Sequence, residues 1–228
     1  MLCILQSRMS SQRLPGKMML DVKGRVLLGR VIDRLKQAKS LNKIIVATSD
    51  NPSDQSIADF CKFENIKCFR GSLNNVADRF RQIAEQEKAE AFVRINGDSP
   101  LMDPAIVDHA VKLFKQGECD LVTNVLPRTF PKGQSVEVIR YENFKAIFDS
   151  SMTDNQKEHV TKVYYDNPII FRIVNFTSGM DLGKMNLCID TNDDLTRIEK
   201  IIERLGDKPG NWRELATIYK TIQTKEIG

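Results

Sequence analysis

The sequence has few of the residues that build metal cages and disulfide frameworks. Only two histidines are present, and the five cysteines are an odd number with no Cys-x-x-Cys pair among them. This composition argues against a zinc cage and against a secreted disulfide scaffold. We therefore expect reduced thiols in a cytoplasmic protein, at Cys3, Cys61, Cys68, Cys119 and Cys188.

Long hydrophobic runs and a large excess of one charge are also missing. The opening residues Met-Leu-Cys-Ile-Leu-Gln-Ser-Arg turn polar after a few apolar side chains, so they fit neither a signal peptide nor a membrane span. The 34 Lys and Arg residues against 30 Asp and Glu leave a net charge of +4, far weaker than the field of a dedicated nucleic-acid-binding protein. We expect neither a membrane nor a nucleic acid as a partner.

The sequence does contain short apolar runs that alternate with amphipathic stretches, and its 228 residues suit one domain. This alternation predicts an α/β fold with a Rossmann-like, mostly parallel sheet and helices on both faces. The predicted strands are 2–5, 43–48, 66–69, 91–95, 120–124 and 186–190. The predicted helices are 26–39, 52–63, 75–87, 104–115, a helix capped by Asn192 or Asp193 that reaches Leu205, and 212–224.

The pattern changes between about Pro127 and Gly183, where prolines and glycines interrupt short β-like segments. We interpret residues 127–183 as a small β-rich excursion from the main sheet. Because neither an internal repeat nor a linker is visible, we expect a single domain that spans residues 1–228.

A loop rich in cations follows the first predicted strand. Residues 6–17 read Gln-Ser-Arg-Met-Ser-Ser-Gln-Arg-Leu-Pro-Gly-Lys and have no apolar period. Open α/β sheets bind ligands at the carboxyl ends of their strands, so Arg8, Arg13 and Lys17 suit a triphosphate there. Neither the Walker A spacing nor the dinucleotide fingerprint is present. On charge alone, an ordinary solvated basic loop is the commoner explanation.

Two aspartates follow other predicted strands. Asp98 stands in Asn-Gly-Asp-Ser-Pro after residues 91–95, and Asp190 ends the run Leu-Cys-Ile-Asp. Mg²⁺ takes one or two carboxylates together with waters and substrate phosphates, so Asp98 and Asp190 opposite a cationic loop suit phosphoryl-type transfer. Asp193 and Asp194 are explained at least as well as acids that cap a helix or favour its dipole.

These segments carry a family resemblance that spans nearly the whole chain. Residues 6–17 closely resemble the N-terminal signature of sugar-acid cytidylyltransferases, especially the spore-coat polysaccharide type and the CMP-ketodeoxyoctonate synthetases, with the acylneuraminate cytidylyltransferases as related enzymes. The resemblance implies the nucleotide-diphospho-sugar transferase fold. Further matches follow in order: Ile-Val-Ala-Thr-Ser at 45–49, Asn-Gly-Asp-Ser-Pro-Leu at 96–101, Lys-Glu-His-Val-Thr at 157–161 and Ile-Asp-Thr-Asn-Asp-Asp-Leu at 189–195.

The resemblance implies roles for individual residues. Lys17, Arg8, Asp98 and Asp190 are the expected catalytic residues, with Asp98 and Asp190 as ligands of the Mg²⁺ cofactor. The expected nucleotide-binding residues are Gln6, Arg8, Ser10, Arg13, Lys17, Asn75, Asp78, Arg79 and Asn96. Asp78 and Arg79 are explained equally well as exposed charges of a helix.

The expected acceptor-binding residues are Arg128, Gln134, Glu137, Glu158 and His159. His159 stands in the Glu-His motif, whereas His109 lies on a plain helix without a supporting motif. The chain departs from the family pattern at two positions. It has Ser99 where the spore-coat type commonly has Cys or Glu, and Gln134 where it usually has Leu or Ile.

The resemblance implies transfer of CMP from CTP to a sugar with a free anomeric hydroxyl, usually a 2-keto-3-deoxy acid, with release of pyrophosphate. It also implies a homodimer whose contact and acceptor pocket are built by residues 127–183. Two alternatives stay open: another nucleotide or a sugar-phosphate or alditol-phosphate acceptor, and a catalytically silent nucleotide-binding subunit that shares the fold.

Overall fold

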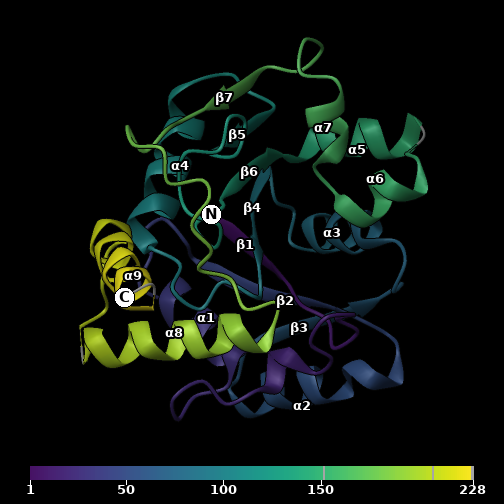
Figure 1. Cartoon of the computed structure of the whole chain (residues 1–228). Coiled ribbons are helices and arrows are strands. Elements are labelled where there is room, and N and C mark those ends of the chain that lie inside the picture. Colours follow the sequence, from purple (N-terminus) through teal and green to yellow (C-terminus); the bar gives the residue numbers. More distant parts are fainter. Residues whose placement is uncertain (151, 207, 227–228) are drawn as a thin grey trace.

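A seven-stranded mixed sheet forms the centre of the computed structural model, which describes residues 1–150, 152–206 and 208–226 (Figure 1). Its strand order is β3-β2-β1-β4-β6-β5-β7. Among these strands only β6 runs antiparallel to its neighbours, as the register of each pair shows. The strands are β1 (Leu2–Gln6), β2 (Lys43–Ser49), β3 (Lys67–Gly71), β4 (Ala91–Asn96), β5 (Leu121–Thr123), β6 (Glu137–Arg140) and β7 (Ile173–Asn175).

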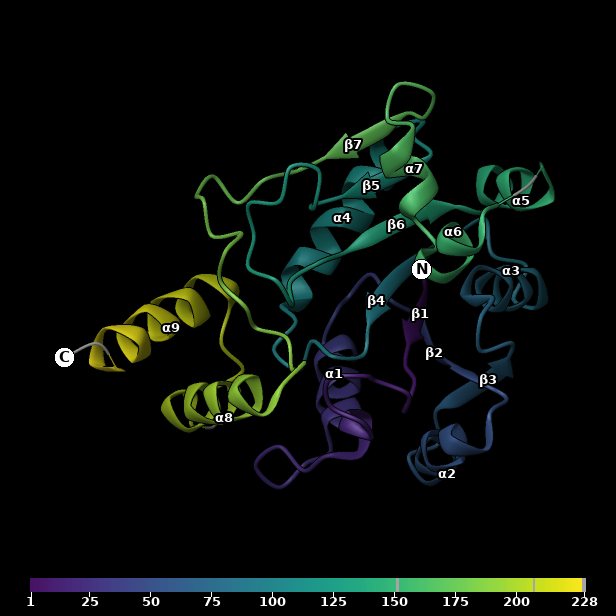
Figure 2. The same cartoon turned by 45° about the vertical axis from the view of Figure 1, so that its right-hand side comes forward.

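Helices cover both faces of the sheet, and each face has its own hydrophobic cluster (Figures 1 and 2). One cluster packs against α1 (Leu27–Leu35), α2 (Gln55–Phe63), α4 (Pro104–Gln116), α8 (Asn192–Leu205) and α9 (Trp212–Glu226). The other packs against α3 (Val76–Gln86), α5 (Tyr141–Ser150) and α7 (Lys162–Asp166), with α6 (Asp154–His159) lying beside α3. Two short 3-10 helices, η1 (Lys17–Met19) and η2 (Pro52–Asp54), complete these elements.

Strand β1 shows why the central strands read as continuous apolar runs. Successive side chains of a strand point to opposite faces, and here Cys3 and Leu5 enter one cluster while Leu2 and Ile4 enter the other. A strand between two helical layers must be apolar on both faces. The predicted α/β fold with helices on both faces is therefore confirmed.

The stretch 127–183 is organised differently from the prediction. It does not leave the main sheet, because β6 inserts between β4 and β5 and β7 pairs with β5 at the sheet edge. Between these strands the chain is helical, through α5, α6 and α7. Prolines and glycines lie in the turns between these short elements. Their spacing in the sequence predicts short β-like segments, because it does not distinguish short helices from short strands.

Two further boundaries differ from the prediction. Residues 186–190 form no sheet strand but an irregular segment with one isolated bridge, between Asn186 and Lys132, and the amide of Leu187 donates to the carbonyl of Lys132 at 2.8 Å. The helix expected over 26–39 ends at Leu35, where hydrogen-bonded turns replace it.

The five cysteines form no disulfide with one another in the described structure. Within the described part of the chain, every helix is too short or too polar to cross a membrane.

Candidate active site

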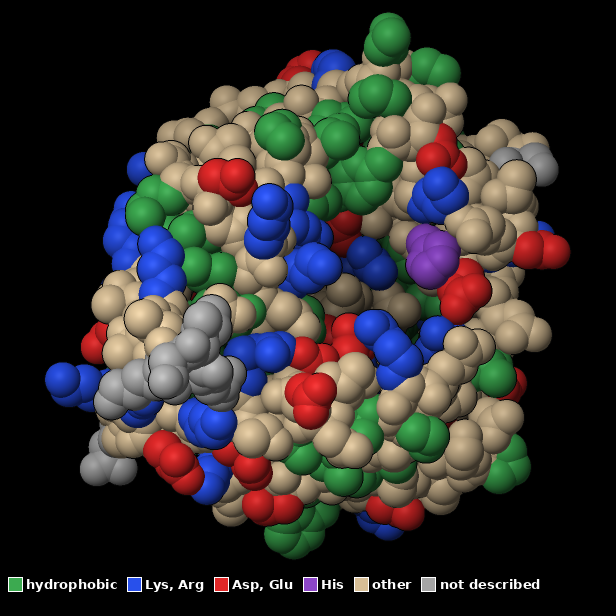
Figure 3. All heavy atoms as spheres, in the orientation of Figure 1, with side chains coloured by type: hydrophobic (Ala, Val, Ile, Leu, Met, Phe, Trp, Pro, Cys, Tyr) green, Lys and Arg blue, Asp and Glu red, His purple; other side chains and the backbone are tan. Residues whose placement is uncertain are grey.

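An open cleft of about 470 Å³ lies at the carboxyl ends of β1 and β4. Figure 3 shows it as a hollow near the middle of the molecule, with basic side chains gathered around it. Parallel strands deliver the residues that follow them to one edge of a sheet, so residues 6–17 and 96–98 meet there. The residues that line the cleft are Gln6, Ser7, Arg8, Ser11, Gln12, Arg13, Lys17, Met18, Arg94, Asn96, Gly97, Asp98, His159 and Asp190.

Gly97 allows the ends of β1 and β4 to approach each other. Its amide donates to the carbonyl of Gln6 at 2.8 Å. A Cβ atom at this position would lie 2.3 Å from the hydroxyl of Ser7 and 3.0 Å from the carbonyl of Gln6, so any other residue would force one of these neighbours to shift. The glycine therefore lets the cationic loop start directly beside Asp98.

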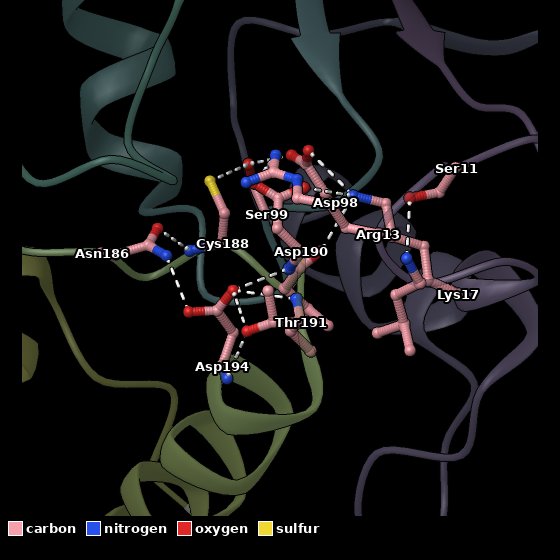
Figure 4. Close-up of polar contacts among 12 residues, drawn as sticks. Ser11, Arg13, Lys17, Asp98, Ser99, Asn186, Cys188, Asp190, Thr191 and Asp194 are labelled. Carbon is pink, nitrogen blue, oxygen red and sulfur yellow. Dashed lines mark hydrogen bonds and ion pairs between the residues drawn. The ribbon is translucent and has the colours of Figure 1, made fainter.

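Lys17 lies at the centre of the site and is held by both predicted metal ligands (Figure 4). Its ammonium nitrogen is 2.8 Å from Oδ1 of Asp190, 3.3 Å from Oδ2 of Asp98 and 2.8 Å from the carbonyl of Ile189. The Lys17 side chain is only 8% exposed. Through these two ion pairs, Lys17 and the two acids form one charged cluster.

The remaining loop cations also lie at the cleft. Arg13 is 2.9 Å from Oδ2 of Asp190, and its side chain is 67% exposed. Arg8 pairs with Glu158 at 3.1 Å, which ties the loop to α6. The sequence-predicted cations and acids are thus brought together, since Lys17, Arg13, Asp98 and Asp190 share direct contacts.

Asp190 is positioned by the start of α8 and by the loop that carries Asp98. The amide of Ile189 donates to the carbonyl of Asp98 at 2.9 Å, which holds the two acidic segments side by side. Thr191 and Asp194 then form a capping box at the start of α8. The predicted cap at Asn192 or Asp193 is therefore wrong, because the hydroxyl of Thr191 accepts from the amide of Asp194.

Asp194 also fixes the backbone of Asp190 (Figure 4). Its Oδ2 accepts the amides of Asp190 and Thr191 at 3.0 and 2.9 Å, and its Oδ1 is paired with Arg197. Burial opposes the ionisation of Asp194, but these partners outweigh burial and hold the pKa of its carboxyl below the ordinary value. Asp194 therefore contributes to the site by holding the backbone of Asp190 in place.

We expect this carboxylate to make stability depend on pH. A depressed pKa stabilises the fold above the unfolded-state value of about 3.9, and that contribution is lost as the pH falls through the folded-state pKa. Asp194→Asn should lower the free energy of unfolding by about 2 kcal/mol at pH 7 and flatten its decline in acid. Urea unfolding of both proteins between pH 7 and pH 3 measures this. Equal acid dependence in both would contradict it.

Arg94 is a cleft residue that the sequence analysis missed. Its guanidinium pairs with Glu137 and donates to Oε1 of Gln6 at 3.0 Å and to the hydroxyl of Thr161 at 3.2 Å. Glu137 also accepts from the hydroxyl of Tyr165. A charged residue inside the apolar run Ala-Phe-Val-Arg-Ile was the available signal, because strands buried on both faces seldom carry one.

Some predicted nucleotide-binding residues lie outside the cleft. Asn75 caps α3 and lines a neighbouring cavity with Arg8 and Glu158, and Asp78 pairs with Arg81. Ser10 is exposed but does not line the cleft.

Arg79 is completely buried, so the alternative that it is an exposed charge of a helix is wrong. Within the described residues, its three guanidinium nitrogens have no hydrogen-bond partner. Burial lowers its pKa to about 10, so it is protonated at neutral pH.

Three predicted acceptor residues also have other positions. Gln134 is fully buried, and its side chain bonds the amide of Asp103 and the carbonyl of Leu101 at 2.8 and 2.7 Å. This corrects its assignment to the acceptor pocket, since those bonds serve the core.

The other predicted acceptor residues differ in position. Glu137 is buried behind Arg94, and Arg128 donates to the hydroxyl of Ser135 away from the cleft lining. Glu158 contacts Arg8, and His159 lines the cleft.

The chemistry of the donors fits a hard divalent cation. Asp98 and Asp190 offer carboxylate oxygens beside an open, polar cleft, which is the small donor set that Mg²⁺ accepts when water and phosphate complete its shell. Among the described residues, no group of three or more His, Cys, Asp or Glu could form a protein-only cage. A cation held partly by its substrate therefore suits this site better than a structural metal.

Comparison with known proteins agrees with the motifs. A family model for cytidylyltransferases matches residues 2–223. The chain is 30% identical over 220 residues to the spore coat polysaccharide biosynthesis protein SpsF of Bacillus subtilis, covering 91% of this chain and 88% of that protein. It is 28% identical over 172 residues to the 3-deoxy-manno-octulosonate cytidylyltransferase of Chlamydia trachomatis, covering 71% and 66% of the two chains.

The structure also has a close counterpart among solved proteins. A cytidylyltransferase from Leptospira borgpetersenii superposes with a TM-score of 0.93 at 29% identity, covering 98% of this chain and 95% of that one. The family model, the SpsF protein and the Leptospira structure each match nearly the whole chain, so they confirm the resemblance drawn from the motifs. The chain belongs to the cytidylyltransferase family.

Proposed function

We propose that this protein transfers CMP from CTP to the anomeric hydroxyl of a sugar, in the biosynthesis of a surface polysaccharide or glycoconjugate. The observation that carries the proposal is the cluster in which Lys17 lies between Asp98 and Asp190, beside Arg13 and within reach of a polar cleft. Cations and acids in one cleft suit a reaction in which charge moves onto a departing phosphate.

In the proposed reaction the sugar hydroxyl oxygen attacks the α-phosphorus of CTP. A new phosphorus–oxygen bond forms, the bond from the α-phosphorus to the bridging oxygen breaks, pyrophosphate leaves, and the hydroxyl proton passes to solvent. Arg8, Arg13 and Lys17 would bind the β- and γ-phosphates, where negative charge accumulates. Asp98 and Asp190 would hold Mg²⁺, which neutralises phosphate oxygens when bound.

The nucleoside would extend toward Asn75, Asp78 and Arg79. A buried guanidinium without a hydrogen-bond partner costs several kcal/mol, on the order of 3 or more. The acceptor atoms of a base or ribose would supply the bonds that Arg79 lacks. Because Arg79 is completely buried and lines neither the cleft nor the neighbouring cavity, a nucleoside could contact it only after the side chains that cover it move aside.

The acceptor is proposed to be a 2-keto-3-deoxy sugar acid. Arg94 and His159 line the cleft, and Gln6 receives two donors from Arg94 on its oxygen, which leaves the Gln6 amide nitrogen to donate to a ligand. Donors of this kind suit a carboxylate. The names of two relatives, a spore coat polysaccharide protein and a sugar-acid cytidylyltransferase, point the same way.

Pyrophosphate release with all four nucleoside triphosphates tests the proposal against its alternatives. Each nucleotide is incubated with Mg²⁺ and with 3-deoxy-manno-octulosonate, other sugar acids, sugar phosphates or alditol phosphates. The proposal expects release with CTP and a sugar acid. Preference for another nucleotide or for a phosphorylated acceptor favours the first alternative, a nucleotidyltransferase with a different substrate. CTP binding without turnover on any acceptor favours the second, a catalytically silent subunit.

We further propose a homodimer whose contact lies in residues 127–183. The segment around β7 exposes apolar side chains, among them Ile169 at 99% and Ile170 at 74%. Figure 3 shows a group of hydrophobic side chains over the loop between α7 and β7. Patches of this kind on soluble proteins commonly mark protein contacts.

The dimer is testable by sedimentation at micromolar concentrations. We expect a dimer for the unmodified chain and a monomer for Ile170→Asp, since a carboxylate in an apolar contact stays unpaired and costs about 2 kcal/mol or more. Phe63→Asp is the matched control, because Phe63 is also exposed, at 86%, but lies on α2. A monomeric unmodified chain contradicts the proposal.

A further inference from the structure

A buried aspartate outside the cleft holds the backbone of the cationic loop. Asp54 ends η2 and is completely buried. Its Oδ1 accepts the amide of Met9 at 2.7 Å. Its Oδ2 accepts the amide of Ser49 and the hydroxyl of Thr48, each at 2.9 Å, and also the Ser49 hydroxyl. Four donors from β2 and from the loop thus fix one carboxylate.

Met9 connects the position held by Asp54 to the rest of the loop. Its carbonyl accepts the amides of Ser11 and Gly16 at 2.9 and 3.0 Å. Gly16 has a positive φ of 76°, which closes the loop directly before Lys17. Arg8 precedes Met9, and Arg13 lies inside the loop that Met9 closes.

In the described parts of the chain, no other hydrogen bond links the backbone of residues 8–16 to anything beyond the adjoining residues 17–19. The geometry points to Asp54 as the positioning residue that holds the triphosphate-binding loop in its binding shape. This inference rests on the proposed function, because it presumes that residues 8–17 bind the triphosphate of CTP. A loop fixed in advance loses less entropy when it binds.

The charge of Asp54 supports the same assignment. Burial opposes its ionisation, but the hydrogen bonds from Ser49, Met9 and Thr48 outweigh burial and hold its pKa below the ordinary value. Asp54 is therefore ionised at neutral pH, as an acceptor of four hydrogen bonds should be.

Asp54→Asn in the full chain tests the assignment through binding. The amide group keeps the size of the carboxylate but loses its charge and half of its acceptor capacity. We expect the Kd for CTP with Mg²⁺ to rise about 10-fold to 100-fold by calorimetry. The Kd for CMP should change by less than about 2-fold, because CMP lacks the β- and γ-phosphates that the loop is proposed to bind. Hydrogen exchange of residues 7–19 should become faster.

Asp103→Asn is the matched control. Asp103 is also buried and accepts two backbone amides, from Ala105 and Trp212 at 2.9 Å each, but it does not contact the loop. This variant should lose stability while both affinities and the exchange of residues 7–19 stay unchanged. If Asp54→Asn does not fold, the double variant Thr48→Val/Ser49→Ala removes two hydroxyl donors from the same carboxylate. It should show a smaller rise in the Kd for CTP, again without a change in the Kd for CMP.

The results separate the inference from the function on which it rests. An unmodified chain that binds neither CTP nor CMP overturns the proposed function. An unmodified chain that binds both, together with Asp54 variants that keep the CTP affinity or lose CTP and CMP equally, overturns the positioning role alone.

Discussion

Lys17→Met is expected to lower kcat/KM for CTP by about 10³-fold to 10⁴-fold. Lys17 is the cation that contacts both Asp98 and Asp190, and its side chain is nearly buried. Methionine keeps much of the length and the apolar stem but removes the charge that would stabilise the departing phosphates. Steady-state kinetics with saturating acceptor measure this effect.

The same variant has a second readout that does not depend on turnover. Without Lys17 the two carboxylates lose their buried counter-charge, so the free energy of unfolding should fall by about 2 kcal/mol. Mg²⁺ at millimolar concentration should restore part of that loss, because a divalent cation can take the place of the ammonium between them. Lys23→Met is the control, since Lys23 pairs with Glu203 outside the cleft. A variant with normal CTP turnover, or one that Mg²⁺ does not stabilise, contradicts the role given to this cluster.

Asp190→Asn is expected to lower kcat by about 10²-fold to 10³-fold, with a smaller change in the KM for CTP. Its two oxygens contact Lys17 and Arg13 separately, at 2.8 and 2.9 Å. The amide removes one anionic donor from the proposed Mg²⁺ site and leaves the two cations without their shared partner. The loss should therefore appear mainly in the transition state.

Asp193→Asn makes the same chemical change three residues further on. Asp193 is exposed in the first turn of α8, where an acid only complements the helix dipole. Its kcat should stay within about 2-fold of the unmodified value. If both variants are equally active, Asp190 has no part in the reaction.

The sequence was most informative where local pattern and position in the fold agree. The apolar runs of β1, β2 and β4 could be read directly, because strands between two helical layers are apolar on both faces. The cationic loop and Asp98 followed from the rule that ligands bind at the carboxyl ends of such strands. These strands and this loop could be predicted because their patterns involve residues that are close together in the sequence.

The features that the sequence did not show, or that were assigned to the wrong role, depend on contacts between distant residues. Gln134 reaches the backbone of Leu101 and Asp103, and Arg94 gains Glu137 and Gln6 as partners only when β6 inserts beside β4. No local pattern shows that β6 pairs with a strand some forty residues earlier. The apolar segment before α8 has the pattern of a strand, but its amides bond single residues of two loops.

Asp54 shows the same limit most clearly. Its sequence context, a proline turn before a helix, reads as ordinary helix initiation. Its importance comes from the amide of Met9, which lies forty-five positions earlier in the chain.

The central claim is that the chain transfers the CMP portion of CTP, and the fate of labelled phosphate tests it most directly. CTP labelled at the α-phosphorus and CTP labelled at the γ-phosphorus are incubated separately with enzyme, Mg²⁺ and the sugar acid that gives the fastest pyrophosphate release. The account predicts that the α label appears in a CMP-sugar and the γ label in pyrophosphate, and that both products form about 10²-fold to 10³-fold more slowly in Asp190→Asn. A γ label in the sugar, or an α label recovered only as free CMP, would contradict it.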